Sequence, residues 1–353
     1  MAASLIICRK LGWSIYSSTW LARDKINNAY VAIKILTGAA TVVARPQDTW
    51  ELRTLHRVSS PSNAHCLQIL SYFTLPGKGS SGEHFCLVTQ ILGASVIGLS
   101  EAYGGKTIPP PLAKRILLHA LRGIAHTHSR GAIHTDLCLR AIFFDTGMSN
   151  SDIDNLLESD PSRRHPPKES YDGTMQAAVS QPLPVPTLQE TLPIGASTDE
   201  INTYDYLRPP ENFIRGPWDE PVDIWSFGCL IFELITGYPL FKFQPWPPLN
   251  LDEPNYMLWQ MISYTSEGFH PEQLRASERA AEFFDRTCNL EHSNPPLRQD
   301  HIERCIRCYT SVEEEDIVST AAVIRRCLRL DPANRPSAAE LLTDPWFAGV
   351  DPV

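Results

Sequence analysis

The spacing of apolar residues changes near residue 92, and this change constrains the fold more than any other feature. Before it, short runs rich in β-branched and aromatic residues alternate with turns, which is typical of strands. One stretch, Thr49–Val58, has helical spacing instead. The sequence therefore predicts a small antiparallel sheet with a single helix in residues 1–92. The predicted strands are Leu5–Leu11, Thr19–Arg23, Tyr30–Leu36 and Phe85–Gln90.

Residues 93–350 show mainly helical spacing. Pro111–His128 is an amphipathic repeat with proline at its start, a favoured first helical residue. At about 147–190 the composition shifts to Ser, Asp and Pro, which favours a solvated, extended and flexible insert. We therefore predict an α+β protein whose second, helical part is interrupted by this insert. The other predicted helices are Val222–Thr236, Tyr256–Tyr264, Val318–Leu328 and Ser337–Leu342.

Composition limits the classes of function. A net charge of −9 disfavours direct binding of nucleic acid and suits partners that carry Lys or Arg. The longest apolar stretch, Trp225–Phe241, contains Glu233 and Pro239, so no membrane anchor is expected. The nine cysteines are scattered, which favours an intracellular protein of the cytoplasm or nucleus. Cys305 and Cys308 form a C-x-x-C without a second pair at zinc spacing, and a helix explains their spacing equally well.

Two segments carry candidate chemistry. Val31-Ala32-Ile33-Lys34 predicts a strand that ends in a lysine able to reach phosphate groups, and Glu51 follows on the predicted helix, where it can pair with Lys34. His134-Thr135-Asp136 predicts a loop whose carboxylate can accept a proton from a hydroxyl group. Five residues after Asp136 stands Ala141, which has no donor atom for a hard cation such as magnesium.

With three later segments, these motifs resemble the protein kinases, and they occur in the same order. The later segments are Arg208-Pro209-Pro210-Glu211, Asp223–Gly228 and Asp331–Pro336. The resemblance implies a two-lobed kinase fold, with an N-lobe at 1–92 and a C-lobe at 93–350. It also implies a buried ion pair between Glu211 and Arg335, and it assigns Asp223 to holding the backbone of the Asp136 loop.

Within that superfamily the chain is similar to the SR-protein kinases, which phosphorylate Ser in arginine-serine-rich proteins. The similarity rests on Leu11-Gly12-Trp13, Ser17, Trp20-Leu21-Ala22, the H-T-D loop and the insert after it. It implies ATP as cofactor, Asp136 as catalytic residue and partners that are proteins, with Arg/Ser-rich ones docking on Asp252, Glu253 and the acidic run 313–316. The nucleotide-binding residues implied are Gly12, Thr19, Ala32, Lys34, Glu51, Gln90 and Leu92.

The chain departs from the family pattern where charge is handled. Ser14 replaces a glycine of the phosphate loop and Thr19 a valine, while Cys138 and Ala141 replace the loop lysine and the metal-binding asparagine. The magnesium-binding D-F-G is also missing: its place is taken by Pro193-Ile194-Gly195. We therefore expect weak ATP binding, no protein ligand for magnesium, and catalysis that is lost or very weak, which leaves a binding or scaffold role.

Two alternatives stay open at this stage. An active Ser/Thr kinase would need another carboxylate for the metal, such as Asp145 or Asp199. Alternatively, the abrupt transition between residues 185 and 200 indicates an incomplete gene model that lacks the strand and the D-F-G turn. The physiological partner, the pathway and the oligomeric state have no signature in the sequence.

Overall fold

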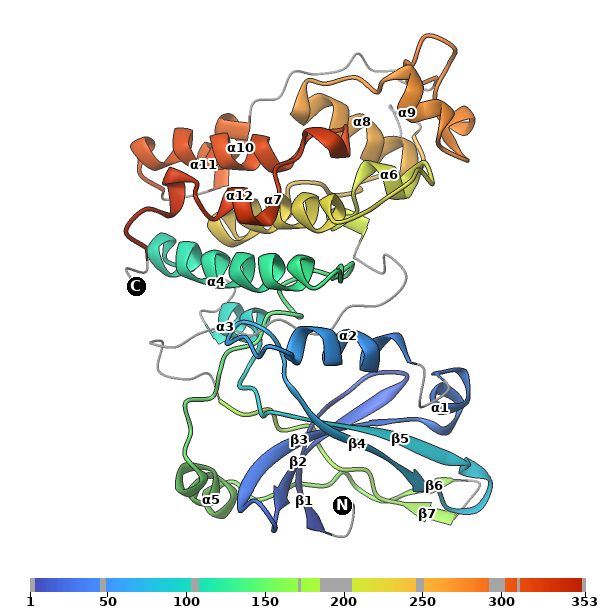
Figure 1. Cartoon of the computed structure of the whole chain (residues 1–353), viewed down its shortest axis with the longest axis vertical. Coiled ribbons are helices and arrows are strands. Elements are labelled where there is room, and N and C mark those ends of the chain that lie inside the picture. Colours follow the sequence, from blue (N-terminus) through green and yellow to red (C-terminus); the bar gives the residue numbers. More distant parts are fainter. Residues whose placement is uncertain are drawn as a thin grey trace. The chain divides into compact units, whose positions relative to one another are not determined.

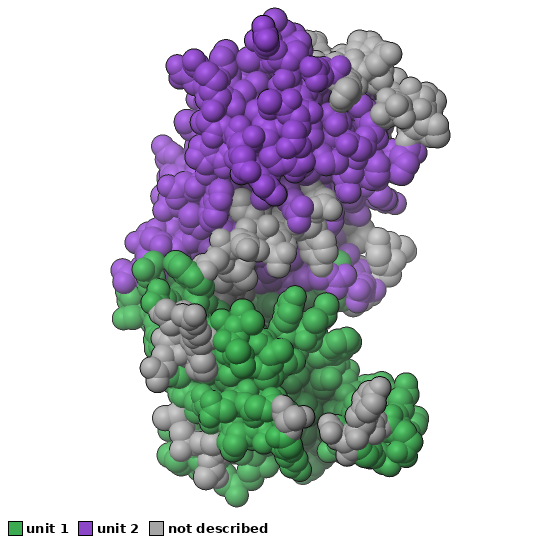
Figure 2. Space-filling model, turned by 90° about the vertical axis from the view of Figure 1, so that its right-hand side faces the viewer, with its two compact units in different colours: residues 1–99, 143–196 green, residues 100–142, 197–353 purple. Residues whose placement is uncertain are grey.

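The computed structural model describes residues 4–44, 49–102, 108–170, 173–184, 205–245, 251–291, 302–309 and 312–350 (Figure 1). The chain divides into two compact units, coloured separately in Figure 2. Unit 1 contains residues 1–99 and 143–196, and unit 2 contains residues 100–142 and 197–353. Residues 143–196, which follow the H-T-D loop, thus belong with the sheet and not with the helices.

Unit 1 is built on a five-stranded antiparallel sheet in the order β1-β2-β3-β5-β4. Its first helices follow β3 directly in the chain and lie beside the sheet (Figure 1). The strands are β1 (Leu5–Trp13), β2 (Ser17–Asp24), β3 (Ala29–Leu36), β4 (Ile69–Pro76) and β5 (Glu83–Thr89), and the helices are α1 (Gly38–Ala44) and α2 (Trp50–Ser59).

Successive side chains along each strand point to opposite faces of the sheet, and both faces bury apolar residues. On one face, Val31, Ile33, Cys86 and Val88 form an apolar cluster with Ala22. The other face packs against α2 in a cluster of Leu36, Leu52, Leu55, Phe85 and Leu87. Lys34 belongs to this second face because it is two residues from Leu36, so its side chain is directed toward the α2 side.

The described part of the predicted flexible insert contains secondary structure. Helix α5 (Asn150–Ser159) begins with a capping box, in which Ser149 and Asp152 satisfy each other's backbone amides. Ile153 is fully buried and packs with Leu21, Tyr30 and Leu183. A two-stranded hairpin follows, β6 (Lys168–Ser170) and β7 (Gly173–Met175).

Polar contacts fix both ends of this segment to the sheet. The guanidinium of Arg9 on β1 is only 1% exposed and lies 3.3 Å from a carboxylate oxygen of Asp160. The Gln181 amide donates to the carbonyl of Lys10 (2.8 Å), and the Gln181 side chain donates to Asp160. The prediction of an extended segment is therefore wrong for residues 150–159, because Ser149 and Asp152 cap a helix there.

Unit 2 is helical, and α7 (Pro221–Thr236) is its buried centre. Helices α4, α10 and α11 pack on α7. Gly228 permits close packing, since a Cβ there would lie 2.6 Å from the Cβ of Cys327 on α11. The other helices are α4 (Pro110–Ser129), α6 (Pro210–Phe213), α8 (Glu253–Thr265), α9 (Pro271–Arg275), α10 (Ile302–Tyr309), α11 (Glu314–Cys327) and α12 (Ala338–Leu341), while α3 (Val96–Ala102) straddles the two units.

The predicted α+β class is confirmed, as are the four predicted strands and the helices predicted in the later part. The sequence analysis did not predict β4, α1, α3, α5, α6, α9 or the pair β6 and β7. The division at residues 92 and 93 stays a prediction. None of the helices among the described residues is both long enough and apolar enough to cross a bilayer.

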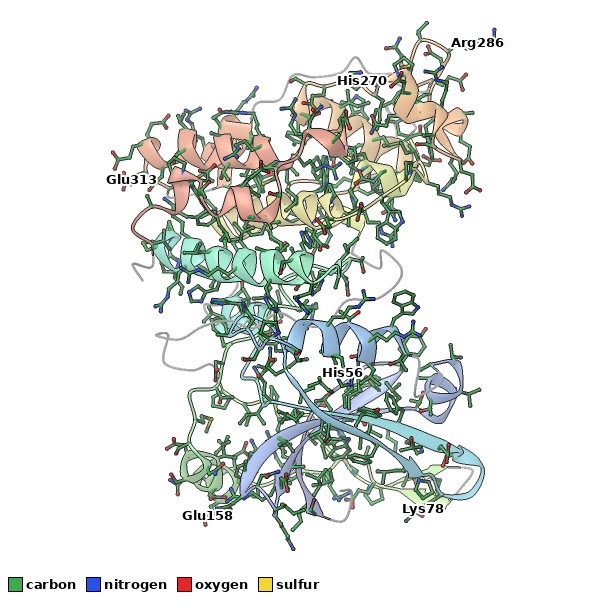
Figure 3. The ribbon with its side chains drawn as sticks, viewed as in Figure 1. His56, Lys78, Glu158, His270, Arg286 and Glu313 are labelled. Atoms are coloured by element: carbon green, nitrogen blue, oxygen red, sulfur yellow. The ribbon has the colours of Figure 1, made fainter. Side chains whose placement is uncertain are left out.

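We expect Ile153→Ala to lower the free energy of unfolding of the chain by about 2–5 kcal/mol, because it opens a cavity under a helix that is packed on the sheet. Glu158→Ala on the exposed side of the same helix (Figure 3) should change it by less than about 0.5 kcal/mol. Urea denaturation measures both. Equal, small effects of the two substitutions would show that α5 does not pack on the sheet.

Candidate functional site

Four predicted nucleotide-binding residues share one face of the unit 1 sheet. Across the antiparallel pairs, Gly12 lies opposite Thr19, and Thr19 lies opposite Lys34. Directly opposite residues project to the same side, and Ala32 joins them because it is two residues from Lys34. The sheet therefore presents Gly12, Thr19, Ala32 and Lys34 together, although they come from three strands.

The predicted pair between Lys34 and Glu51 is formed. The Lys34 Nζ lies 2.5 Å from Glu51 Oε1, with side chains that are 35% and 26% exposed. Such a partly exposed ion pair contributes little to stability, about 0–1 kcal/mol. Its main effect is to orient the lysine, which leaves the remaining ammonium hydrogens free to contact an anion.

The turn between β1 and β2 is closed by its own serine. The Ser14 hydroxyl accepts hydrogen bonds from the backbone amides of Tyr16 (3.3 Å) and Ser17 (3.1 Å), and the Ser14 amide donates to the Ser17 carbonyl (2.8 Å). Backbone amides at such a turn are the donors that bind phosphate in glycine-rich loops. Ser14 therefore occupies the donors that a phosphate group would need.

The segment after β5 keeps backbone donors available among the described residues. The Gln90 amide donates to the Gln68 carbonyl (3.3 Å), and the Gly93 amide donates to the Phe144 carbonyl (2.8 Å). Between them, the Leu92 amide has no hydrogen-bond partner among the described residues. The Leu92 amide can thus donate a hydrogen bond to the base of a nucleotide, whereas the backbone of Gln90 can contribute only its carbonyl oxygen.

In unit 2, Asp223 on α7 holds the loop that carries Asp136, as the kinase resemblance implied. Its carboxylate accepts hydrogen bonds from the amides of His134 (2.7 Å) and Thr135 (2.8 Å) and from His128 Nε2 (2.8 Å). Burial alone would raise the pKa of Asp223, but the hydrogen bonds and charge of the histidines lower it. Thr135 has a φ of 62°, a strained value for a β-branched residue that these two amide bonds stabilise.

The carboxyl group of Asp136 is partly desolvated by burial. Burial raises its pKa to about 6. Cys138 lies two residues after Asp136 and is only 4% exposed. Burial raises the pKa of its thiol to about 11, so the thiol is neutral at pH 7. Ala141 offers only its backbone, and its amide donates to the Cys138 carbonyl (2.9 Å). The loop therefore presents the carboxyl group of Asp136, and neither Cys138 nor Ala141 adds a side-chain oxygen beside it.

One residue near this loop was missed by the sequence analysis as a site candidate. Glu233 of α7 is largely buried, its Oε2 has no partner among the described residues, and burial raises its pKa to about 7. Its charge also contributes to raising the pKa of Cys138. The signal in the sequence is a single acid within an apolar stretch, which by itself indicates only that the stretch is not a membrane span.

The predicted ion pair between Glu211 and Arg335 is confirmed and buried. Two guanidinium nitrogens donate to the two carboxylate oxygens at 2.6 and 2.8 Å, with side chains 2% and 0% exposed. Arg335 also donates to the carbonyls of Arg329 (2.8 Å) and Pro221 (3.0 Å) and stacks on Trp225. Removing one partner of such a pair costs about 3–5 kcal/mol, because an unpaired charge stays buried.

The structure says less about the other metal-site candidates of the sequence analysis. Pro193-Ile194-Gly195 and Asp199 lie outside the described residues. Asp145 lies in unit 1 and accepts from the Gly147 amide (3.2 Å), and nothing further tests it as a metal ligand. Cys305 and Cys308 lie on α10, as the helix interpretation predicted, and the described ranges contain no group of three potential metal ligands.

The acidic residues proposed for docking already have partners in part. Asp252 caps α8 by accepting from the Asn255 amide (3.1 Å). In the run 313–316, Glu314 pairs with Arg307, and Asp316 pairs with Lys114 at 2.9 Å. This surface therefore offers less uncompensated negative charge than its sequence indicated.

Comparison with known proteins agrees with this geometry. Residues 188–347 match the family model of the protein kinase domain. The chain is 25% identical to the serine/threonine-protein kinase SRPK of Physarum polycephalum, over 98% of this chain and 86% of that protein. It is 32% identical to the serine/threonine-protein kinase SKY1 of Saccharomyces cerevisiae, over 44% of this chain and 21% of that protein. Protein kinase dsk1 of Schizosaccharomyces pombe is 23% identical over 98% of this chain and 80% of that protein.

The antiparallel sheet of unit 1 and the helices of unit 2 are those of a two-lobed protein kinase. Residues 188–347 thus match the protein kinase domain, and over nearly its whole length the chain resembles the SR-protein kinases.

The raised pKa of Asp136 predicts a pH-dependent stability. A carboxyl whose pKa is about 6 when folded and 3.8 otherwise binds its proton more tightly in the folded state, so folding loses stability as the pH rises through this interval. We expect Asp136→Asn to unfold like wild type at pH 4 and to be more stable at pH 7.5 by up to about 2 kcal/mol.

Chemical denaturation from pH 4 to 8 measures this difference. Glu233→Gln is the matched control. Because the pKa of Glu233 is about 7, Glu233→Gln should gain stability over wild type at a higher pH than Asp136→Asn does. A difference between wild type and Asp136→Asn that does not change with pH would mean that Asp136 is hydrated.

Proposed function

We propose that this protein is an SR-protein-kinase-like protein that binds nucleotide weakly, transfers phosphate very slowly or not at all, and acts by binding protein partners. The observation that carries the proposal is the Asp136 loop. It keeps its proton acceptor, while Cys138 is a buried neutral thiol and Ala141 has no ligand atom in its side chain.

Energetics supports the loss of catalysis. Phosphoryl transfer depends almost wholly on positioning and on stabilising charge that develops on the transferred group. The thiol of Cys138 is neutral at pH 7, so the position at which the family has a lysine supplies no positive charge. Each factor of ten in rate corresponds to about 1.4 kcal/mol, so losing the lysine and the metal ligands together removes several factors of ten.

The surviving contacts support weak binding of ATP. Glu51 orients Lys34 so that its ammonium group can contact a phosphate oxygen of ATP, and the Leu92 amide can donate to the adenine base. Against these, Ser14 occupies two amides of the β1–β2 turn. The residues present thus fit a nucleotide in part, and those described do not fit its magnesium ion.

The partners we propose are arginine-rich proteins of the cell interior, such as Arg/Ser-rich ones. The support is the similarity to the SRPK protein over nearly the whole chain and the net charge of −9. Direct binding of nucleic acid is not part of the proposal, because this charge would repel a phosphate backbone.

We expect ATP to raise the melting temperature only slightly, and magnesium to add little to that shift. Stabilisation by a ligand follows RT ln(1 + [L]/Kd), so a thermal-shift titration reports affinity directly. Lys34→Met should reduce the shift, and Ser14→Gly should increase it by releasing the amides of Tyr16 and Ser17.

Lys25→Met, an exposed lysine on the β2–β3 turn, is the control and should leave the shift unchanged. A large additional stabilisation on adding magnesium would contradict the proposal, because it would reveal a metal site. No effect of Ser14→Gly on a measurable ATP shift would show that the turn amides do not meet the phosphates.

A further inference from the structure

Two exposed tyrosines on unit 2 form a ring pair that has no role in the steps above. Tyr238 and Tyr309 are 56% and 51% exposed, their ring centroids lie 5.0 Å apart, and the rings are tilted by 34°. Tyr238 follows the C-terminus of α7, and Tyr309 is the last residue of α10. Both belong to unit 2, so the pair is defined within one unit.

Contacts with the core hold both tyrosines in place. The ring of Tyr309 meets that of Phe232 edge-on at a centroid distance of 6.4 Å, and Phe232 is buried in α7. Gly237 ends α7 with a φ of 79°, a left-handed conformation that suits glycine. The next amide, that of Tyr238, donates to the buried hydroxyl oxygen of Thr236 (3.2 Å). A ligand therefore meets a preformed surface, and little free energy is lost in ordering these side chains.

This surface offers apolar ring area and two hydrogen-bond donors. Each phenol hydroxyl can donate one hydrogen bond, and neither has a partner among the described residues. The two rings lie against each other, so they leave no space between them for a cation, and the pair is not a cation-binding cage. A matching ligand thus has flat apolar groups next to free carbonyl oxygens.

Those two properties occur together in the polyproline II conformation. It has no internal hydrogen bonds, so its carbonyl oxygens are free to accept, and its pyrrolidine rings are apolar and rigid. Proline-rich segments bind in this conformation to surfaces lined by aromatic side chains. A helix or a paired strand uses its backbone carbonyls internally and offers the two hydroxyls fewer acceptors.

The charge beside the pair limits the ligand further. Arg307, in the last turn of α10, pairs with Glu314 at the start of α11, which brings the acidic run 313–316 close to the end of α10. Within this run, Glu313 (labelled in Figure 3) and Glu315 are exposed and have no ion-pair partner among the described residues. A lysine next to the prolines is therefore complementary in charge, whereas a nucleic acid would be repelled.

We propose that Tyr238 and Tyr309 bind a proline-rich segment of a partner protein. The segment lies in the polyproline II conformation, with its rings on the tyrosines and its carbonyl oxygens accepting from their hydroxyls. A lysine beside the prolines faces Glu313 or Glu315. The inference goes beyond the proposed function, because it requires neither nucleotide nor an arginine-rich partner.

The test measures binding of a fluorescent peptide, one lysine followed by eight prolines, to the full-length protein by anisotropy and without nucleotide. Tyr238→Phe and Tyr309→Phe each remove one hydroxyl and keep the ring, so both variants should fold. We expect each to weaken binding about threefold to tenfold, which is the effect of one hydrogen bond. Tyr238→Ala removes a half-exposed ring and should weaken binding by more than about tenfold.

Tyr72→Phe is the matched control. Tyr72 is 45% exposed and also contacts aromatic rings, those of His56 and Phe85, but it lies on β4 of unit 1. Loss of its hydroxyl should leave binding unchanged. Equal losses for Tyr72→Phe and for the two pair variants would overturn the proposal, and so would unchanged binding in both pair variants.

Peptide chemistry separates the conformation of the ligand from its charge. A peptide in which every second proline is replaced by glycine keeps the lysine but populates polyproline II less, and it should bind at least about fivefold more weakly. Replacing the lysine by norleucine should reduce binding by less than about threefold, because the glutamates contribute only at an exposed rim.

Equal binding of the proline and glycine peptides, or no binding of the proline peptide at millimolar concentration, would contradict the proposal. None of these peptides contains arginine, and the assay contains no nucleotide. Failure here is therefore distinguishable from a failure of the proposed function.

Discussion

The buried carboxylate of Asp223 is the interaction on which the candidate site depends. It accepts two consecutive backbone amides of the loop and the His128 ring, so one side chain on α7 fixes both the position of the loop and the left-handed conformation of Thr135. Asp136 is the next residue and takes its position from this arrangement. Because α7 is itself the buried centre of unit 2, these bonds tie the loop to the core.

The buried contacts that hold the fold of this protein do not depend on the side chains at positions 138 and 141 of the Asp136 loop. The Glu211–Arg335 pair and the Asp223 contacts are buried, so losing one partner would leave an unsatisfied charge or amide inside the unit. Ala141 and Cys138 satisfy their surroundings without a lysine or an asparagine, since the Cys138 side chain is simply buried as a small apolar group. The fold can therefore keep its geometry after its charge-handling residues have gone.

Much of the fold could be predicted from the sequence because apolar spacing and local motifs determine it. Strand β3 and helix α2 were identified in this way, and the Lys34–Glu51 pair followed from them. Helix α5 could not, because Ser149 and Asp152 contribute equally to a loop composition and to a capping box, and only the burial of Ile153 distinguishes the two. The contact between Ser14 and the turn amides was equally hidden, since it depends on the closure of the hairpin. Glu233 was visible as one acid in an apolar helix, but its buried oxygen is a property of packing.

Magnesium-dependent incorporation of phosphate into an Arg-Ser peptide tests the central claim most directly. Wild type is compared with Asp136→Asn, which removes the proton acceptor, and with Cys138→Lys/Ala141→Asn, which restores two charge-handling groups of the loop. We expect wild type and Asp136→Asn to be indistinguishable, and the double variant to remain inactive because the D-F-G aspartate is still missing. Robust incorporation by wild type that is lost in Asp136→Asn would contradict the account and identify an active kinase.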